Sequence, residues 1–247
     1  MTALRNIDRL PPAIRPAVAS YLEEMLSLHA GNVLSVFLYG SAAGADYVPK
    51  HSDINLCFIF NKLDFEVLEK SLKTAAKGAK KKITAPLFFT PEMIAASSDV
   101  FPVEFLEMKE KHVLLYGEDL ISAVDIKTEY LRLFCEEQLK GKLIRIRHAC
   151  LETGLRPVQF KSLLRGSFKT LLPIFRNLIR LKGTHPPVKK EEIIKEMARH
   201  YDLDPAAFLA IPEKTVGKRS ANSDELKILF RDFIRQLNEL VQKVDRS

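Results

Sequence analysis

The sequence predicts an α+β protein in which a small mixed-sheet domain, residues 1–124, precedes an all-α helical bundle, residues 125–247. Short apolar runs rich in β-forming residues are confined to the first half. Long segments with helical periodicity fill the second half.

The charged residues are also distributed unequally between the two halves. Residues 1–120 carry 13 basic and 15 acidic side chains, net −2, whereas residues 121–247 carry 25 and 16, net +9. Such an asymmetry indicates two domains with different roles.

The first domain is expected to combine helices with short buried strands. Residues 11–30 show helical spacing of apolar side chains and end at Gly31-Asn32, a suitable left-handed cap. Residues 33–39 (VLSVFLY) and 53–60 (DINLCFIF) are apolar runs typical of buried strands. The remaining expected elements are a helix over 64–77 with Phe65, Leu68 and Leu72 on one side, a strand over 83–89, a helix start at 90–92, and extended segments over 103–108 and 113–116.

The second domain is expected to be a bundle of helices without strands. Glycine, proline and polar residues mark its connectors at 154–157, 183–187 and 212–223. The helices predicted from apolar periodicity are 126–152, 157–182, 189–200 and 223–244.

A row of basic side chains is expected on the helix 157–182, which Pro173 should kink. At the helical period these cations fall within a sector of about 100°; they are Lys161, Arg165, Lys169, Arg176 and Arg180. One interpretation is an ordinary solvated face. The other is a cationic wall facing a triphosphate or anionic acceptor across an interdomain cleft, with Lys169 and Arg176 as phosphate-binding residues.

Composition narrows the class of protein further. The three cysteines of the 247 residues are widely spaced, so no disulfide framework or CxxC metal clip is expected and a reducing cytoplasm fits. No stretch has the roughly 20 apolar residues of a spanning helix, so no membrane partner is expected. The net charge of +7 suggests nucleic acid, but few aromatics interleave with the basic residues and there is no Trp. A base-stacking surface, and hence a nucleic-acid partner, is disfavoured.

The most informative stretch is LYGSAAGADYVPKHSDINLCFIF, residues 38–60. A strand ends at Gly40-Ser41, which can offer backbone N–H groups and a hydroxyl to a phosphate. The next strand opens with Asp53 and Asn55, which are two residues apart and therefore share one face. Two polar side chains at the mouth of a buried strand are costly unless they bind a ligand.

This stretch resembles the nucleotidyltransferase superfamily, which has a DNA polymerase β-like fold, and in particular the bacterial aminoglycoside-nucleotidyltransferase-like two-domain proteins. The shared pattern is a strand, Gly-Ser, a loop of about ten residues, and Ser-Asp-hydrophobic-Asp on the next strand. The resemblance extends to about Asp119 and implies that the helical half holds the acceptor. It also implies that Gly40 and Ser41 grip the triphosphate of an NTP such as ATP, while the residues at 53 and 55 hold Mg²⁺.

The chain departs from this pattern at two of the three carboxylate positions. Asp53 fits the first, but Asn55 stands at the second, where its amide can bind a cation only through a neutral oxygen. The expected third strand, ITAPLFF, has no acid, and Thr84 is the nearest counterpart. Glu104 and Glu107 are the nearby acids that could substitute, and Glu104 is taken as the candidate third catalytic residue beside Asp53 and Asn55.

Two functions follow from these residues. The first is transfer of a nucleoside monophosphate from an NTP to a hydroxyl of a small molecule, with Mg²⁺ held by Asp53 and Asn55. The second is a catalytically degenerate descendant that keeps the fold as a nucleotide- or partner-binding module. Binding of RNA or DNA by the basic half ranks behind both.

Overall fold

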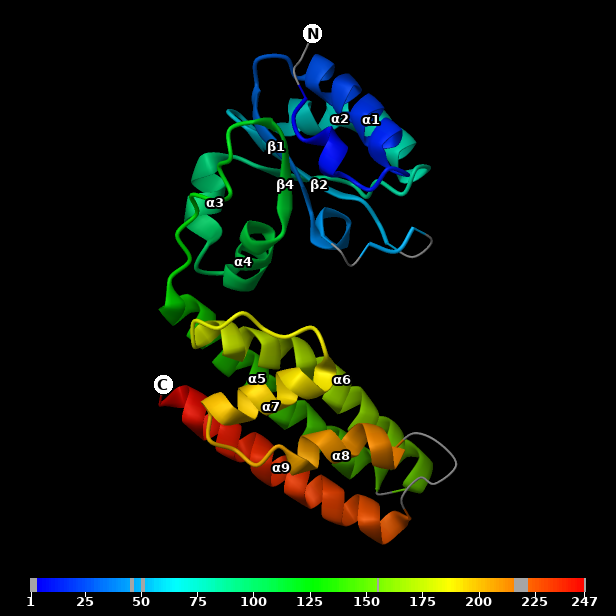
Figure 1. Ribbon diagram of the computed structural model, residues 1–247, viewed down its shortest axis with the longest axis vertical. Coiled ribbons are helices and arrows are strands. Elements are labelled where there is room, and N and C mark those ends of the chain that lie inside the picture. The colour runs from blue at the N-terminus through cyan, green and yellow to red at the C-terminus, as the bar shows by residue number, and fades with distance from the viewer. Residues whose placement is uncertain (1–3, 45–46, 50–51, 155, 216–221, 247) are drawn as a thin grey trace. The chain divides into compact units, whose positions relative to one another are not determined.

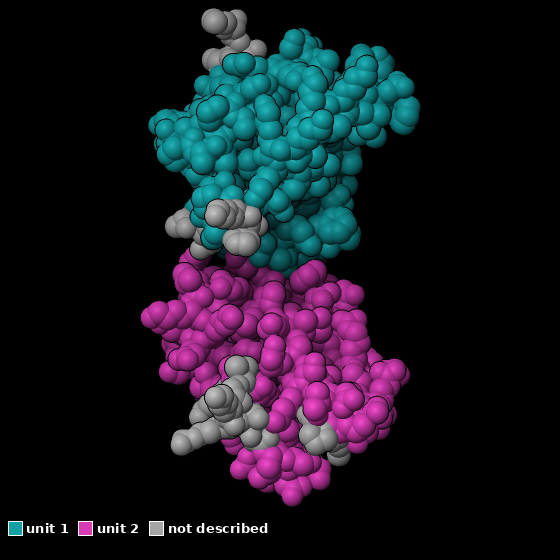
Figure 2. Space-filling model, turned by 90° about the vertical axis from the view of Figure 1, so that its right-hand side faces the viewer, with its two compact units in different colours: residues 1–126 teal, residues 127–247 magenta. Residues whose placement is uncertain are grey.

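The protein is described by a computed structural model that covers residues 4–44, 47–49, 52–154, 156–215 and 222–246 (Figure 1). The chain forms two compact units, residues 1–126 and residues 127–247, coloured separately in Figure 2. The first contains a mixed sheet with helices and the second is helical, so the fold is α+β. The expected loop at 40–52 and the expected connector at 212–223 fall partly outside the described residues.

The sheet of the first unit has four strands in the order β3-β2-β1-β4. β1 pairs antiparallel with both β2 and β4, whereas β2 pairs parallel with β3. The strands are β1 (Val33–Tyr39), β2 (Asn55–Phe60), β3 (Leu87–Phe89) and β4 (His112–Gly117). The sheet is therefore mixed, as the sequence predicts.

Helices cover both faces of this sheet, because alternate residues of the buried strands point to opposite sides (Figure 1). On one face Leu56 and Phe58 pack with α1 (Arg15–Leu28) and α2 (Phe65–Ala79). On the other face side chains of β1 and β2, including Cys57, pack with those of α3 (Pro91–Ser97) and α4 (Pro102–Glu110). The described part of this unit also contains two short 3-10 helices, η1 (Ile7–Arg9) and η2 (Gly40–Ala43).

Two sequence expectations for this unit are wrong in detail. The strand expected over 83–89 is reduced to β3, preceded by an isolated bridge between Ile54 and Ile83. The segment 103–108, expected to be extended, lies in helix α4. Phe105 and Met108 are three residues apart and both enter the core, a spacing that suits a helix.

The second unit consists of helices packed around α6, which contacts each of the other four. Its described helices are α5 (Thr128–Thr153), α6 (Pro157–Leu181), α7 (Lys190–His200), α8 (Ala206–Thr215) and α9 (Ser223–Asp245). Helix α8 was not expected, and it extends into the segment predicted as a connector because Phe208 packs its ring between those of Phe175 and Phe233. Helix α6 continues through Pro173.

Candidate functional site

The candidate site lies where β1 ends beside the start of β2. Tyr39, the last residue of β1, is directly opposite Asn55 in the antiparallel register. The chain then turns at Gly40, whose φ of 77° lies in the left-handed region that favours glycine. Ser41 follows in η2 and is half-buried. The two strands thus bring together Gly40, Ser41 and Asn55, as the sequence predicts.

The side chains of Asn55 and Thr84 form a neutral pair beside the Gly-Ser turn. The bridge between Ile54 and Ile83 places the segment before β3 alongside β2. The Thr84 hydroxyl then donates to Oδ1 of Asn55 at 2.9 Å. The amide nitrogen of Asn55 is on the side of Gly40, because a Cβ added to Gly40 would lie 3.2 Å from Nδ2. The amide is therefore oriented with its N–H groups toward the Gly-Ser turn.

Asp53 lies just before β2 and its side chain is exposed. No hydrogen bond or ion pair connects it to another residue in the described part of the chain. It is two residues from Asn55, so the two positions share the sheet face that carries Cys57. A carboxylate without a partner among the described residues is available to an external ligand.

Two acids near this face, Glu104 and Asp119, differ in how they are held. Glu104 is exposed in the first turn of α4, and no described hydrogen bond or ion pair joins it to Asp53. Asp119 is held by the Ser122 hydroxyl and backbone N–H and contacts Nε2 of His112 at 3.2 Å. Burial opposes ionisation of Asp119, but these hydrogen bonds outweigh it and lower its pKa. Asp119 is thus already satisfied within the fold.

These donors do not fit the paired-carboxylate magnesium centre of the family pattern. Of these three residues only Asp53 carries a charge, because Asn55 and Thr84 are neutral and are hydrogen-bonded to each other. Among the described residues no group of three or more His, Cys, Asp or Glu side chains is suited to hold a metal ion. Mg²⁺ bound with substrate phosphates usually has one or two carboxylate ligands. The assignment of Asp53 and Asn55 as metal ligands stays a prediction, and we derive no chemical step through a metal.

The cations expected to bind phosphate lie on α6 in the helical unit. Lys169 is exposed, whereas Arg176 is half-buried and donates to the backbone oxygen of Val188 at 3.2 Å. This hydrogen bond holds the segment between α6 and α7 against α6. Lys169 has no hydrogen bond or ion pair within the described ranges, so its ammonium remains available to an anion.

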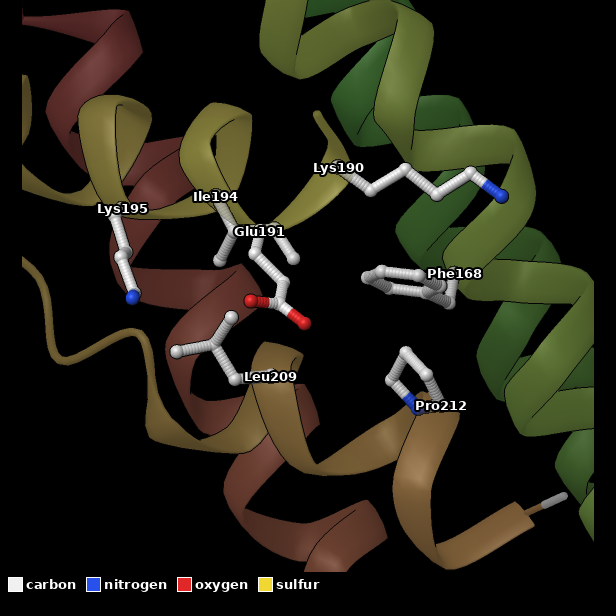
Figure 3. Close-up of a pocket in the computed structure, with 7 residues that line it drawn as sticks. All are labelled: Phe168, Lys190, Glu191, Ile194, Lys195, Leu209 and Pro212. Atoms are coloured by element: carbon white, nitrogen blue, oxygen red, sulfur yellow. The ribbon is translucent and has the colours of Figure 1, made fainter. Parts of the chain in front are cut away.

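A cavity of about 550 Å³ opens between α6, α7 and α8 in the same unit (Figure 3). Its lining combines apolar and charged side chains, namely Phe168, Lys190, Glu191, Ile194, Lys195, Leu209 and Pro212. Figure 3 shows the Glu191 carboxylate directed between Phe168 and Leu209, while the Lys190 amine points toward α6. The sequence did not predict this cavity, because its residues are adjacent only after three helices pack together.

The chain is thus an α+β protein in which a Gly-Ser turn lies beside the polar side chain of Asn55 at the start of β2. No protein-family model matches the sequence, and no curated protein matches it. Among solved structures, the chain is similar to spectinomycin adenyltransferase AAD(9) from Enterococcus faecialis, crystallised with ATP and spectinomycin. The superposition covers 93% of this chain and 99% of that chain, with 10% identity and a TM-score of 0.48. A likeness at this level carries no functional information.

Within the described residues, no helix is both long and apolar enough to cross a membrane.

Proposed function

We propose that the sheet-containing unit binds the phosphates of a nucleoside triphosphate at the Gly40–Ser41 turn, as a nucleotidyltransferase-like module without the paired metal-binding carboxylates. The observation that carries this proposal is the hydrogen bond from Thr84 to Oδ1 of Asn55. It occupies one of the two acceptor positions of the amide oxygen and leaves the two N–H donors of Asn55 for a ligand. Phosphate oxygens are acceptors, so the site presents donors where the family pattern presents acceptors.

The turn itself supports the same ligand. Gly40 has no Cβ, which leaves the space beside the Asn55 amide open to a phosphate oxygen. The Ser41 hydroxyl has no hydrogen-bond partner among the described residues and adds a further donor. Lys169 belongs to the helical unit, and its assignment to phosphate binding stays a prediction.

A second function, transfer of a nucleoside monophosphate to a small-molecule hydroxyl, is favoured by the carboxylate of Asp53, which is exposed and has no partner in the described part of the chain. In that case Asp53 would be essential and Glu104 would supply the remaining carboxylate. Transfer requires a divalent cation to neutralise charge on the triphosphate. The two functions therefore differ in their dependence on Mg²⁺.

Calorimetric titration of the full chain with each NTP, in Mg²⁺ and in excess chelator, distinguishes them. We expect binding of comparable affinity under both conditions and no release of pyrophosphate. Mg²⁺-dependent pyrophosphate release that Asp53→Ala abolishes would establish the transferase instead. Absence of NTP binding under both conditions would contradict the proposal.

A variant at Asn55 tests the donor arrangement directly. Asn55→Asp places a carboxylate beside the phosphates, so binding in chelator should weaken about tenfold, equivalent to about 1.4 kcal/mol. Mg²⁺ should partly restore it. Asn61→Asp is the matched control, because Asn61 follows β2 at the opposite end and is exposed. An equal loss in both variants would show that Asn55 does not contact the ligand.

A further inference from the structure

Helix α2 turns a face of small and polar residues inward and its large apolar residues outward. The buried positions are Val67, Ser71, Thr74 and Gly78. The exposed fractions of Phe65, Leu68 and Leu72 are 74%, 45% and 63%. Their spacing of i, i+3 and i+7 places them on one side of the helix, as the sequence predicts. That side faces away from the core of its own unit.

Specific contacts hold the inward face of α2 against α1, so the helix cannot rotate to bury its apolar side instead. A Cβ at Gly78 would lie 2.7 Å from Cε2 of Tyr21, so only glycine allows α2 to approach α1 this closely. Thr74 and Lys77 both donate to Oε1 of Glu24 on α1, at 2.8 and 2.6 Å. The apolar stripe is therefore held on the surface by the packing of the opposite face.

The stripe continues to the end of the helix as small residues. Ala76 and Ala79 are exposed and Ala75 is half-buried, and all three extend the side that carries Leu72. A contiguous apolar surface of this kind on a folded unit usually marks an interaction site. The apolar stripe projects furthest at its N-terminal end, where Phe65 lies, and is flatter at its C-terminal end, where the side chains are alanines.

The charges along one flank of the stripe are ordered by sign. Glu66 and Glu69 occupy the N-terminal half, and Lys73 and Lys77 lie toward the C-terminal end. Lys70 already pairs with Glu66 at 2.7 Å. Glu69 and Lys73 have no ion pair or hydrogen bond to any other described residue. The flank is thus complementary to its own reversed copy.

We propose that α2 is the contact surface for a second copy of this chain, with the two α2 helices packed antiparallel about a twofold axis. A twofold perpendicular to the plane of two antiparallel helices keeps their charged flanks on the same side. Glu69 of each copy then faces Lys73 of the other. Phe65 packs over Ala75 and Ala76 of the second copy.

The size of the stripe predicts a weak dimer. The three large side chains expose apolar area on the order of 300 Å², given the 150–250 Å² that a buried aromatic contributes. A standard stable interface buries about 800 Å² on each partner. Association should therefore depend on protein concentration and be detectable near the upper end of a dilution series.

Sedimentation velocity of the full chain across a wide concentration range tests the proposal. The expected result is a concentration-dependent shift from 28.0 kDa toward twice that mass. Leu72→Arg should abolish the shift, and its unfolding midpoint should stay near that of the wild type because Leu72 is exposed. Ile228→Arg on α9, where Ile228 is 52% exposed, is the matched control and should leave association intact.

Charge exchange distinguishes antiparallel self-pairing from any other occupant. Glu69→Lys or Lys73→Glu alone should raise the dissociation constant about tenfold, because symmetry counts each exposed pair twice. The double exchange should restore it. A chain that is monomeric at every concentration, an unchanged dimer in Leu72→Arg, or a double exchange that fails to restore association would each overturn the proposal.

Discussion

Gly40 meets two constraints at the residue scale, one of backbone conformation and one of space. Its φ of 77° disfavours any residue with a Cβ, and an added Cβ would lie 3.2 Å from Nδ2 of Asn55. The same residue therefore shapes the turn and sets how closely the amide approaches it. Changes at Gly40 should affect both stability and the candidate site.

Gly40→Ala should lower the free energy of unfolding by about 1–2 kcal/mol, because a non-glycine residue is strained in the left-handed region. Urea unfolding measures the change. Gly166→Ala is the control, because Gly166 lies within α6 and has nothing within 4 Å of an added Cβ. It should raise stability by about 0.5–1 kcal/mol through helix propensity. Equal changes in the two variants would contradict the explanation.

His29 makes the stability of the sheet-containing unit depend on pH. The side chain is buried, and its Nε2 lies 2.9 Å from the Ser71 hydroxyl, which itself donates to the backbone oxygen of Val67. The Ser71 oxygen therefore accepts a hydrogen bond from the Nε2–H group of His29. Burial, and then the positive charge of Lys70, lower the pKa of His29 from 6.5.

The unfolded chain consequently binds more protons at position 29 than the folded one between the two pKa values. Stability from this group is fully present above about pH 6.5 and is lost as pH falls from there through the lowered pKa. Urea midpoints between about pH 7 and pH 5 should show this decline. His29→Gln should flatten it, whereas His185→Gln, at an exposed site, should not. A decline that is unchanged in His29→Gln would assign it to another group.

At the scale of elements, α9 has the most complete set of N-terminal capping hydrogen bonds in the described chain. The Asn222 side chain accepts from the backbone N–H groups of Asp224 and Glu225. Glu225 in return accepts from the backbone N–H of Asn222, which completes a capping box. Leu226, in the next turn, is fully buried, so the cap fixes where the helix enters the core.

Asn222→Ala should lower the free energy of unfolding of the helical unit by about 1 kcal/mol, the usual cost of losing an N-cap. Ser223→Ala, one residue further along, removes no described hydrogen bond and should have little effect. Helical circular dichroism during urea unfolding measures both. A loss of the same size in Ser223→Ala would show that the cap is not responsible.

Some helices and strands could be predicted from the sequence pattern alone, and others could not. β1 and β2 were predicted because each is a continuous apolar run that fits a strand buried on both faces. Helix α4 was not, since its buried apolar residues Val103, Phe105 and Met108 are two and three positions apart, a spacing that also suits an extended segment. Helix α8 was hidden by Pro212, which lies inside it, and by the polar residues that follow.

At the scale of the whole molecule, each unit has its own hydrophobic core. The sheet unit buries apolar side chains on both faces of the sheet, and the helical unit buries a row of contacting aromatic rings including Phe175, Phe208 and Phe233. Independent cores are what allow domains to fold separately. The two-domain organisation expected at 124–125 therefore becomes a testable proposal with a boundary at 126–127.

Separate expression of residues 1–126 and 127–247 should give two folded proteins, each with a cooperative thermal transition by circular dichroism. Residues 1–100 should fail to fold, because they lack β4, which pairs with β1 and covers its edge. Two fragments that are individually unfolded but fold when mixed would show instead that the units depend on each other.

The sequence alone determined the two-part α+β organisation, the strand pair and the Gly40, Ser41, Asp53 and Asn55 positions, because apolar periodicity and residue spacing are local properties. Only the tertiary structure decided how those side chains are arranged. Parallel pairing before β3 brings the Thr84 hydroxyl to Oδ1 of Asn55 and orients the amide. The packing of Gly78 on Tyr21 likewise decides which face of α2 is buried. Both outcomes depend on contacts between residues about 30 or more positions apart, which a local pattern does not encode.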